Sequence, residues 1–442
     1  MTTPRGLAGR IESLRDAYSA RNGCIFPVNS ENFRQLIHLK AGLARRGHGA
    51  IIDGTTEERT VTSLFESSDL YRRLIAATAG KTSPLLLIDL ERVEAQYRDL
   101  RAALPEARIL YAVKANPHPE ILRRLAALGA GFDIASLGEL ERCRAAGAAI
   151  ENLSYGNPMK KEGDIARAFA AGVGLFVVDS GMELDKITRA APGARVFCRI
   201  AVSGAGAEWP LTHKFGCTVE MAVELLVEAR RRGLVPAGLS FHVGSQQTEP
   251  EAWLHAIHRA GEVFRHAAKQ GISLDFLNLG GGLPAHYRTS LPTLARYVEV
   301  MRAALRENFG KSWPRLLIEP GRYMVGDAGV LLTEVVLVAE RPHERVPRWV
   351  YLDAGVWNGL DETMKERIHY PLHMAGPPRP VGPVVLAGPT CDSADVMYRH
   401  NIELPLDLAA GEKVIFLTAG AYTATCSCID FNGFPPLPVC CI

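Results

Sequence analysis

Long apolar runs, an excess of one charge and paired cysteine motifs are all missing from this sequence of 442 residues. Without a stretch of about 18 consecutive apolar residues, no membrane-spanning helix is expected. The first 20 residues also lack the apolar segment of a secretory signal. Lys and Arg number 50 against 48 Asp and Glu, a formal net charge of +2, which does not favour a nucleic-acid partner.

The nine cysteines stand at irregular spacings and form no pair of CxxC motifs of the kind that binds zinc. We therefore expect no metal site and reduced thiols, as in the cytoplasm. What the sequence does contain is the balance of a globular protein, with 47% hydrophobic and 22% charged residues. A chain of this length exceeds one ordinary core and predicts two domains.

Between about residues 105 and 325, short apolar strands alternate with helical stretches rich in Ala, Leu, Glu and Arg. The strands that we predict are ILYAVK, GFDIAS, NLSYGN, GLFVVDS, RVFCRIAV, GLSFHVGS, DFLNLGGG and RLLIEPGR. Alternating strands and helices indicate a parallel sheet, and eight such units predict a closed (β/α)8 barrel of the TIM type. A doubly wound open sheet is the alternative, and the count of eight favours the barrel.

After residue 325 the sequence pattern changes from alternating strands and helices to β-rich runs separated by Pro and Gly turns. This pattern predicts a second, mainly antiparallel β domain at 326–442. Residues 83–104 are typical of a strand and a helix outside the barrel, and we expect them to join this β domain. Residues 1–82 form an N-terminal extension of unknown role. The predicted fold class is therefore α/β, with a cofactor-binding barrel at 105–325.

Ionisable residues and glycines stand at the ends of most of the predicted strands, where barrel enzymes carry their active sites. In chain order they are Lys114, Asp133, Arg199, His242 with Ser245, Gly280 with Gly281 and Gly282, and Glu319 with Arg322. A single histidine at a strand end is most often structural, and three glycines are usually just a turn. Their convergence on one rim is what favours an active site.

The three glycines and Arg322 together indicate a phosphate site. Barrels commonly bind phosphate with the loops after strands seven and eight, and glycines let backbone N–H groups approach an anion. Arg322 can add a charge-assisted contact. A phosphate site that faces a lysine is typical of pyridoxal phosphate held as a Schiff base, here on Lys114. Glu319 would then keep the pyridine ring protonated, which suits carbanion-forming chemistry such as decarboxylation.

Seven segments together resemble the fold-type III pyridoxal-phosphate decarboxylases, which include ornithine, lysine, arginine and diaminopimelate decarboxylases. In order from about residue 84 to 437 the segments are YAVKANP, FDIASLGEL, FHVGSQ, NLGGG, EPGRY, GPTCDSAD and GAYT…FNGFP. No single segment is specific, whereas the ordered set is very specific. The resemblance implies an alanine-racemase-like architecture, in which the barrel is followed by the β domain.

The resemblance also implies a role for each matching residue. Lys114 would carry the cofactor, His242 would stack on its ring and Glu319 would pair with the pyridine nitrogen. Asp133 and Arg199 would lie near the Schiff base and order it. Residues expected to hold the phosphate are Ser245, Gly281, Gly282, Arg322 and Tyr422, of which Tyr422 is also expected to reach the substrate.

In this family the partner subunit of a homodimer completes each active site through the segment that here reads GPTCDSAD. Cys391 resembles the residue that reprotonates the substrate carbon after carbon dioxide leaves. Asp392, with Asp353 in YLDAGV, resembles the carboxylates that receive the distal ammonium of the substrate. The resemblance therefore predicts a homodimer with shared active sites.

CDSAD stands where diaminopimelate decarboxylases typically read CES.D, and AYTATCSCIDFNGFPP replaces their Tyr-Glu-Ala-Tyr-His type segment. Both features favour a diamine-forming enzyme that acts on ornithine or lysine. The alternatives are a decarboxylase of another amino acid such as diaminopimelate, a racemase, or an inactive relative that regulates an active enzyme. Glu319 argues against a racemase, since racemases of this fold type typically carry arginine there. Trp357 and Asn358 depart from the plainer residues expected near Asp353 and could alter the substrate pocket.

Overall fold

The structure is a computed structural model that describes residues 69–210 and 214–442. Most of the expected N-terminal extension, 1–82, lies outside these ranges. Its described part contains helix α4 (Asp69–Ala77), whose Tyr71 and Leu74 pack on the C-terminal sheet. None of the helices within the two described ranges has the length and apolarity needed to cross a lipid bilayer.

Eight parallel strands form a closed barrel, and each overlaps one of the eight predicted runs, although β2 and β8 begin two and three residues before theirs. The strands are β2 (Ala107–Ala112), β3 (Gly131–Ile134), β4 (Leu153–Tyr155), β5 (Leu175–Val178), β6 (Arg195–Arg199), β8 (Val235–Ser240), β10 (Phe276–Asn278) and β11 (Arg315–Ile318). Because β11 pairs with β2, the sheet has no open edge. The predicted (β/α)8 barrel is confirmed, and the doubly wound alternative is excluded.

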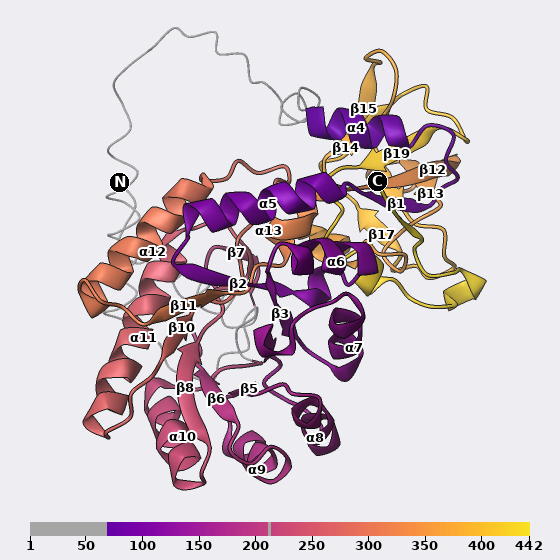
Figure 1. The fold of residues 1–442 in the computed structure, drawn as a ribbon. Helices are drawn as coiled ribbons and strands as arrows, with labels where there is room; N and C mark the ends of the chain where they lie inside the picture. The colour runs from indigo at the N-terminus through magenta and orange to yellow at the C-terminus, as the bar shows by residue number, and fades with distance from the viewer. Residues whose placement is uncertain (1–68, 211–213) are drawn as a thin grey trace, which may run out of the picture. The chain divides into compact units, whose positions relative to one another are not determined.

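Helices surround the barrel strands on the outside (Figure 1). They are α5 (Leu90–Ala103), α6 (Pro119–Ala127), α7 (Leu137–Ala145), α8 (Glu162–Ala170), α9 (Gly181–Ala190), α10 (Val219–Arg231), α11 (Glu251–Lys269) and α12 (Leu294–Phe309). Several begin at a residue whose side-chain oxygen accepts a hydrogen bond from the first turn, as Asp89, Ser136, Thr218 and Thr293 do. Such caps satisfy backbone N–H groups that have no partner within the helix.

The barrel interior is filled, which confines chemistry to its ends. Val177, Phe197, Ala237 and Phe276 form a cluster of buried residues separate from the main core. A side chain at Gly238 would put its Cβ 2.6 Å from the Phe276 ring, so the glycine makes room for that ring. As in other barrels of this kind, the interior is a packed core and not a pore.

A mixed sheet follows the barrel in sequence, in the strand order β14-β19-β12-β13-β16-β17, with β1 beside β12 and β20 beside β1. Its strands are β1 (Leu85–Ile88), β12 (Gly329–Glu340), β13 (Arg348–Leu352), β14 (Leu372–His373), β16 (Val385–Ala387), β17 (Val396–Tyr398), β19 (Lys413–Phe416) and β20 (Val439–Cys441). Most pairs are antiparallel, while β13–β16 and β1–β20 are parallel. The predicted class of a barrel followed by a mainly antiparallel β domain is confirmed.

Short elements complete the described chain. Two small antiparallel pairs join β7 (Ala207–Trp209) to β9 (Ser245–Gln247) and β15 (Val381–Pro383) to β18 (Glu403–Pro405). The short helices are η1 (Val113–Ala115), η2 (Ile150–Asn152), α13 (Arg322–Val325), η3 (Gly326–Ala328), η4 (Asp361–Glu366), η5 (Ala424–Cys426) and η6 (Phe431–Gly433). Of these, η1, α13 and η4 carry side chains that meet at the rim of the barrel.

Candidate active site

Lys114 lies in η1, directly after β2, and its side chain is accessible to solvent at the carboxyl end of the barrel. The residues on either side of it, Val113 and Ala115, are buried. Burial by surrounding protein lowers the pKa of Lys114, but Asp133 and Glu319 oppose this effect, and the net pKa lies above its ordinary value. Lys114 therefore lies near enough to two carboxyl groups, Asp133 in β3 and Glu319 after β11, for both to raise its pKa.

Asp133 is buried and Glu319 is half-buried, and burial is the main cause that raises the pKa of each. The Oδ1 atom of Asp133 is buried and has no hydrogen-bond partner among the described residues. Gly156 makes room for this carboxyl group, since a Cβ there would lie 1.9 Å from Asp133 Oδ1. Arg199, at the end of β6, has its pKa lowered by burial and raised by Glu319. Two carboxyl groups and one further cation, Arg199, thus lie near Lys114.

Asn278, at the end of β10, orients Glu319. Its Nδ2 atom donates to Glu319 Oε1 at 2.5 Å, while its Oδ1 atom accepts from Gly280 N at 2.9 Å. The side chain is fully buried, so neither bond is exposed to competing water. Sequence reasoning missed Asn278, although an amide in a buried strand just before the glycines was a signal.

The glycine loop after β10 packs tightly against the chain that follows β8. A Cβ at Gly280 would lie 2.0 Å from Phe241 O, and one at Gly281 would lie 2.7 Å from Glu319 O and 3.0 Å from His242 Nε2. Any side chain there would displace backbone atoms. Gly244 N donates to His242 Nδ1 at 3.1 Å, and burial holds the pKa of His242 well below its ordinary value. His242 is therefore a neutral ring beside the loop.

Arg322 is nearly fully buried and lies close to the glycine loop through Ser245, whose Oγ accepts from Nε at 3.3 Å and from Nη2 at 3.2 Å. Its guanidinium group also forms a two-bond ion pair with Glu362 of η4 and donates to Tyr287 OH at 2.6 Å. Neither Glu362 nor Tyr287 was predicted, because nothing in the local sequence marks them as partners of Arg322.

Tyr422 lies between the surroundings of Arg322 and those of Lys114 and contacts both. Its ring centroid lies 4.8 Å from Arg322 Cζ, and a Cβ at Gly321 would lie 3.1 Å from its hydroxyl. The backbone N–H of Tyr422 donates to Ala115 O at 2.9 Å, next to Lys114. Its φ of 57° lies in the left-handed region, which is uncommon outside glycine and which tends to occur where the surrounding structure holds a functional residue.

Cys391 and Asp392 lie on a loop of the β domain, and no contact joins them to the Lys114 group within the described residues. Asp395, which is buried, accepts from Val356 N at 2.8 Å and from Thr390 N at 3.0 Å, and so closes the base of the loop. The Cys391 thiol is exposed and free. The hydrogen bonds of Asp395 therefore hold the base of the loop, and the Cys391 thiol at its end is exposed to solvent.

Trp357 supports the same loop from the side. Its ring packs edge-on against Phe431 with centroids 6.0 Å apart, and its carbonyl accepts from Cys428 N at 2.8 Å. The neighbouring Asn432 accepts from Cys391 N at 3.0 Å. Trp357 is thereby linked to the backbone of Cys391 through two packed residues.

Asp353 does not join Asp392 in this chain. Its Oδ1 atom accepts from Glu334 N at 2.8 Å, directly across β12 and β13, and its carboxyl group lies near Ser83 and Lys413. Burial raises the pKa of Asp353. The carboxyl group is thus engaged by the sheet within one chain, and the expected pairing of Asp353 with Asp392 across a dimer stays a prediction.

Comparison with known proteins matches residues 90–326 to the family model "Pyridoxal-dependent decarboxylase, pyridoxal binding domain". A lysine/ornithine decarboxylase of Selenomonas ruminantium is 38% identical over 358 residues, which are 80% of this chain and 88% of that protein. Antizyme inhibitor 2 of Xenopus laevis is 33% identical over 390 residues, 85% of each chain.

Solved structures give the same picture. The lysine/ornithine decarboxylase of Vibrio vulnificus with cadaverine has a TM-score of 0.76 and 33% identity, covering 85% of this chain and 99% of that chain. Its complex with putrescine has a TM-score of 0.75 and 34% identity, with the same coverage. The matched range of the family model contains every rim residue from Lys114 to Arg322.

The residues at the rim fit pyridoxal phosphate. The backbone at Gly280 and Gly281 is packed so closely against neighbouring carbonyl groups that only glycine fits there, which keeps the loop free of side chains. Ser245 and Arg322 supply a hydroxyl and a cation beside that loop. Asp133 Oδ1 is a buried oxygen that lacks a partner near the lysine. These groups match the phosphate and the covalently held end of such a cofactor.

Proposed function

Since this chain belongs to the family of pyridoxal-dependent decarboxylases, we propose that it decarboxylates ornithine, lysine or both, and releases a diamine and carbon dioxide. Membership of this family means that the chain is of the pyridoxal-phosphate-dependent amino-acid decarboxylase type. The observation that carries the proposal is the position of Lys114 near Asp133 and Glu319, on a rim that also holds the glycine loop and Arg322.

Pyridoxal phosphate, when bound, supplies an electron sink for the electron pair that departing carbon dioxide leaves behind. In our proposal Lys114 holds the cofactor covalently through its amine. Glu319, oriented by Asn278, holds a proton at the pyridine nitrogen. His242 is kept neutral by burial and offers an uncharged face to the ring. Ser245 and Tyr422 add hydroxyl donors around the phosphate next to Arg322.

Borohydride reduction followed by peptide mapping tests the lysine assignment. We expect the reduced cofactor to be attached to Lys114 and to no other lysine. A label on a different lysine, or no label on protein that retains the cofactor, would refute the assignment. A release assay for carbon dioxide with ornithine, lysine, arginine and diaminopimelate then tests the substrate, and we expect the first two to be preferred.

The choice of substrate rests on Asp392, which we propose receives the distal ammonium group. A carboxylate shielded from water favours a cation over an uncharged group, and substrates that lack the ammonium should therefore be rejected. One methylene separates ornithine from lysine, which is worth about 1–3 kcal/mol in a pocket. Two of the relatives named above, from Selenomonas ruminantium and Vibrio vulnificus, are lysine/ornithine decarboxylases, which supports a site that accepts both. Another diamino acid such as diaminopimelate is the alternative.

We further propose a homodimer in which Cys391 and Asp392 of each chain complete the site of its partner. The exposed thiol of Cys391, on a loop with no contact to the Lys114 group within the described chain, supports this arrangement. Lys114→Ala and Cys391→Ala, each inactive alone, should complement each other after subunit exchange. Random exchange makes about half of the dimers mixed, each with one intact site, so about a quarter of the activity should return. Confirmed exchange without recovery would place the whole site in one chain.

An inactive regulatory relative is the second candidate, because one similar protein is named antizyme inhibitor 2. Against it stands the retention of Lys114, Glu319 and the glycine loop in one packed group. The absorbance spectrum of the purified protein separates the two candidates. We expect the yellow band of lysine-bound cofactor, whereas a protein that has lost catalysis by losing the cofactor would be colourless.

A further inference from the structure

All five N–H donors of the Arg322 guanidinium group point at protein acceptors. Nη1 donates to Glu362 Oε2 at 2.7 Å and to Tyr287 OH at 2.6 Å. Nη2 donates to Glu362 Oε1 at 2.5 Å and to Ser245 Oγ at 3.2 Å, and Nε donates to the same oxygen at 3.3 Å. An arginine has five such donors and no acceptor. Arg322 is thus saturated by the protein itself.

The two edges of the guanidinium group are not equally held. Glu362 binds the edge formed by Nη1 and Nη2 with short, charge-assisted bonds, whereas Ser245 takes the edge formed by Nε and Nη2 at longer distances. The rings of Tyr422 and Tyr287, with centroids 4.8 and 5.6 Å from Cζ, fix the plane of the group. An anion at the glycine loop can therefore reach only the Ser245 edge.

Because Glu362 is buried, its negative charge acts strongly on the neighbouring Arg322. The side chains of Arg322 and Glu362 are 2% and 9% exposed, so water screens neither of them. In this environment the carboxylate cancels most of the positive charge that Arg322 would offer to an anion. Sequence-based reasoning treated Arg322 as a free cation, because Glu362 lies in η4, 40 residues further along the chain.

We propose that Glu362 sets the affinity of this site for the cofactor phosphate. It holds Arg322 as a neutral pair, which stabilises the cofactor-free protein, and it withholds positive charge and two N–H donors from the phosphate. Glu362 is thus a positioning residue that acts through Arg322. The proposal rests on the proposed function, since it assumes that pyridoxal phosphate binds here.

The test compares pyridoxal phosphate with pyridoxal, which has the same aldehyde but no phosphate. Dissociation constants of both are measured by titration of cofactor-free protein, for the wild type, E362Q and E362D. The ratio of the two constants isolates the contribution of the phosphate. E106Q is the matched control, because Glu106 also forms a two-bond pair with an arginine outside the rim, accepting from Nε and Nη2 of Arg302 at 2.7 and 2.9 Å.

We expect the preference for pyridoxal phosphate over pyridoxal to rise about tenfold in E362Q, roughly the effect of one added charge-assisted hydrogen bond. The cofactor-free E362Q protein should also melt at a lower temperature than the wild type. In E362D the carboxylate is shorter by one methylene and releases one donor, so the preference should rise about threefold. E106Q should leave the ratio unchanged.

An unchanged or reduced preference in E362Q would overturn the proposal, and so would an unchanged preference in E362D where E362Q does not fold. If the wild type binds neither pyridoxal phosphate nor pyridoxal, the proposed function itself fails. If the wild type binds both and only the ratios fail to move, the function stands and the role of Glu362 is wrong.

Discussion

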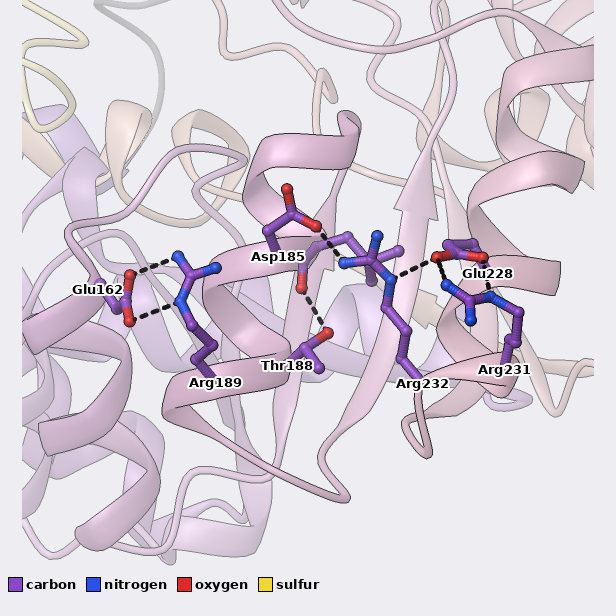
Figure 2. Close-up of polar contacts among 8 residues, drawn as sticks. Glu162, Asp185, Thr188, Arg189, Glu228, Arg231 and Arg232 are labelled. Carbon is purple, nitrogen blue, oxygen red and sulfur yellow. Dashed lines mark hydrogen bonds and ion pairs between the residues drawn. The ribbon is translucent and has the colours of Figure 1, made fainter.

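Arginine–carboxylate pairs occur both on the outer ring of helices and at the barrel rim, and the two regions differ in burial. On the outside, Figure 2 shows Arg189 of α9 with Glu162 of α8, and Arg232 at the end of α10 with Asp185 of α9. It also shows Arg231 and Arg232 with Glu228 at the end of α10 itself. The side chains of Arg189 and Glu162 are 59% and 44% exposed. At the rim, Arg322 and Glu362 have the same chemistry at 2% and 9% exposure.

The difference shows that geometry alone does not give an ion pair its importance. Arg189 binds Glu162 with two bonds of 3.0 and 2.7 Å, close to the geometry of the buried pair. Water and salt screen exposed charges, so such pairs contribute little to stability. A buried charge that loses its partner is costly, because neither water nor protein replaces it. Buried charged groups are therefore the ones whose removal should be visible, and the Arg322–Glu362 pair at the rim is one of them.

Lysine substitutions test this contrast with the largest expected effect. Lys114→Ala at the rim should reduce kcat/KM for the diamino acid by about 10³-fold or more, because the amine that we propose holds the cofactor is lost. Lys269→Ala, at the exposed end of α11, should leave kcat/KM unchanged. Both are measured by release of carbon dioxide. Equal effects of the two variants would break the contrast.

Glutamate substitutions test the contrast in stability. Glu362→Ala should lower the free energy of unfolding of the cofactor-free protein by about 3–5 kcal/mol, because Arg322 would remain as a buried cation without its partner. Glu162→Ala removes an exposed pair of similar geometry and should cause no measurable change. Urea titrations monitored by circular dichroism give both values. A loss that is similar in the two variants would mean that burial does not decide the outcome.

Aspartate substitutions sharpen the contrast within the β domain. Asp392→Asn should lower kcat/KM for the diamino acid by about 10–100-fold, the loss of one hydrogen bond to a charged group. Asp353→Asn should leave the preference among substrates intact and lower the melting temperature instead, because its carboxyl group holds Glu334 N in the sheet. Steady-state kinetics with ornithine and lysine provide the measurement. If Asp353→Asn changes the preference and Asp392→Asn does not, the assignment of the distal site is reversed.

The smallest expected effect concerns pH. His286 Nδ1 lies 2.7 Å from Asp327 Oδ2, and this bond raises the pKa of His286 above its ordinary value. The stabilisation is complete below about pH 6.5, the unfolded value, and is lost as the pH rises through the higher folded pKa. On the outer ring, the pKa of Glu228 is lowered to about 2 by Arg231 and Arg232, so that pair is lost only in strong acid.

Melting temperatures at pH 6 and pH 8.5 therefore separate the two kinds of pair. The difference between wild type and His286→Asn should be positive at pH 6 and shrink at pH 8.5, by a few degrees at most, since His286 is more than half exposed. Glu228→Gln should give the same small difference at both values. A His286→Asn effect that does not depend on pH would show that the pair acts without its charge.

Much of the site was predictable because, in a barrel, the place of a residue at the end of a strand fixes where it lies in space. Residues at the ends of successive parallel strands meet at one rim, so Lys114, Asp133 and Glu319 could be grouped without coordinates. Their roles, and those of Cys391 and Asp392 across two chains, remain predictions for the experiments above. The N-terminal extension lies mostly outside the described residues, and its role stays open to the same kind of test.

The amino-acid sequence by itself determined the eight strand–helix units, their closure into a barrel and the order of the residues around its rim, because apolar periodicity and strand ends are local properties. Only the tertiary structure decided the partners of those residues. Asn278 meets Glu319, Glu362 saturates Arg322, and Asp353 turns into the sheet, each through a bond between segments that are distant in the chain. Burial and bond direction depend on packing in three dimensions, and a linear pattern does not contain them.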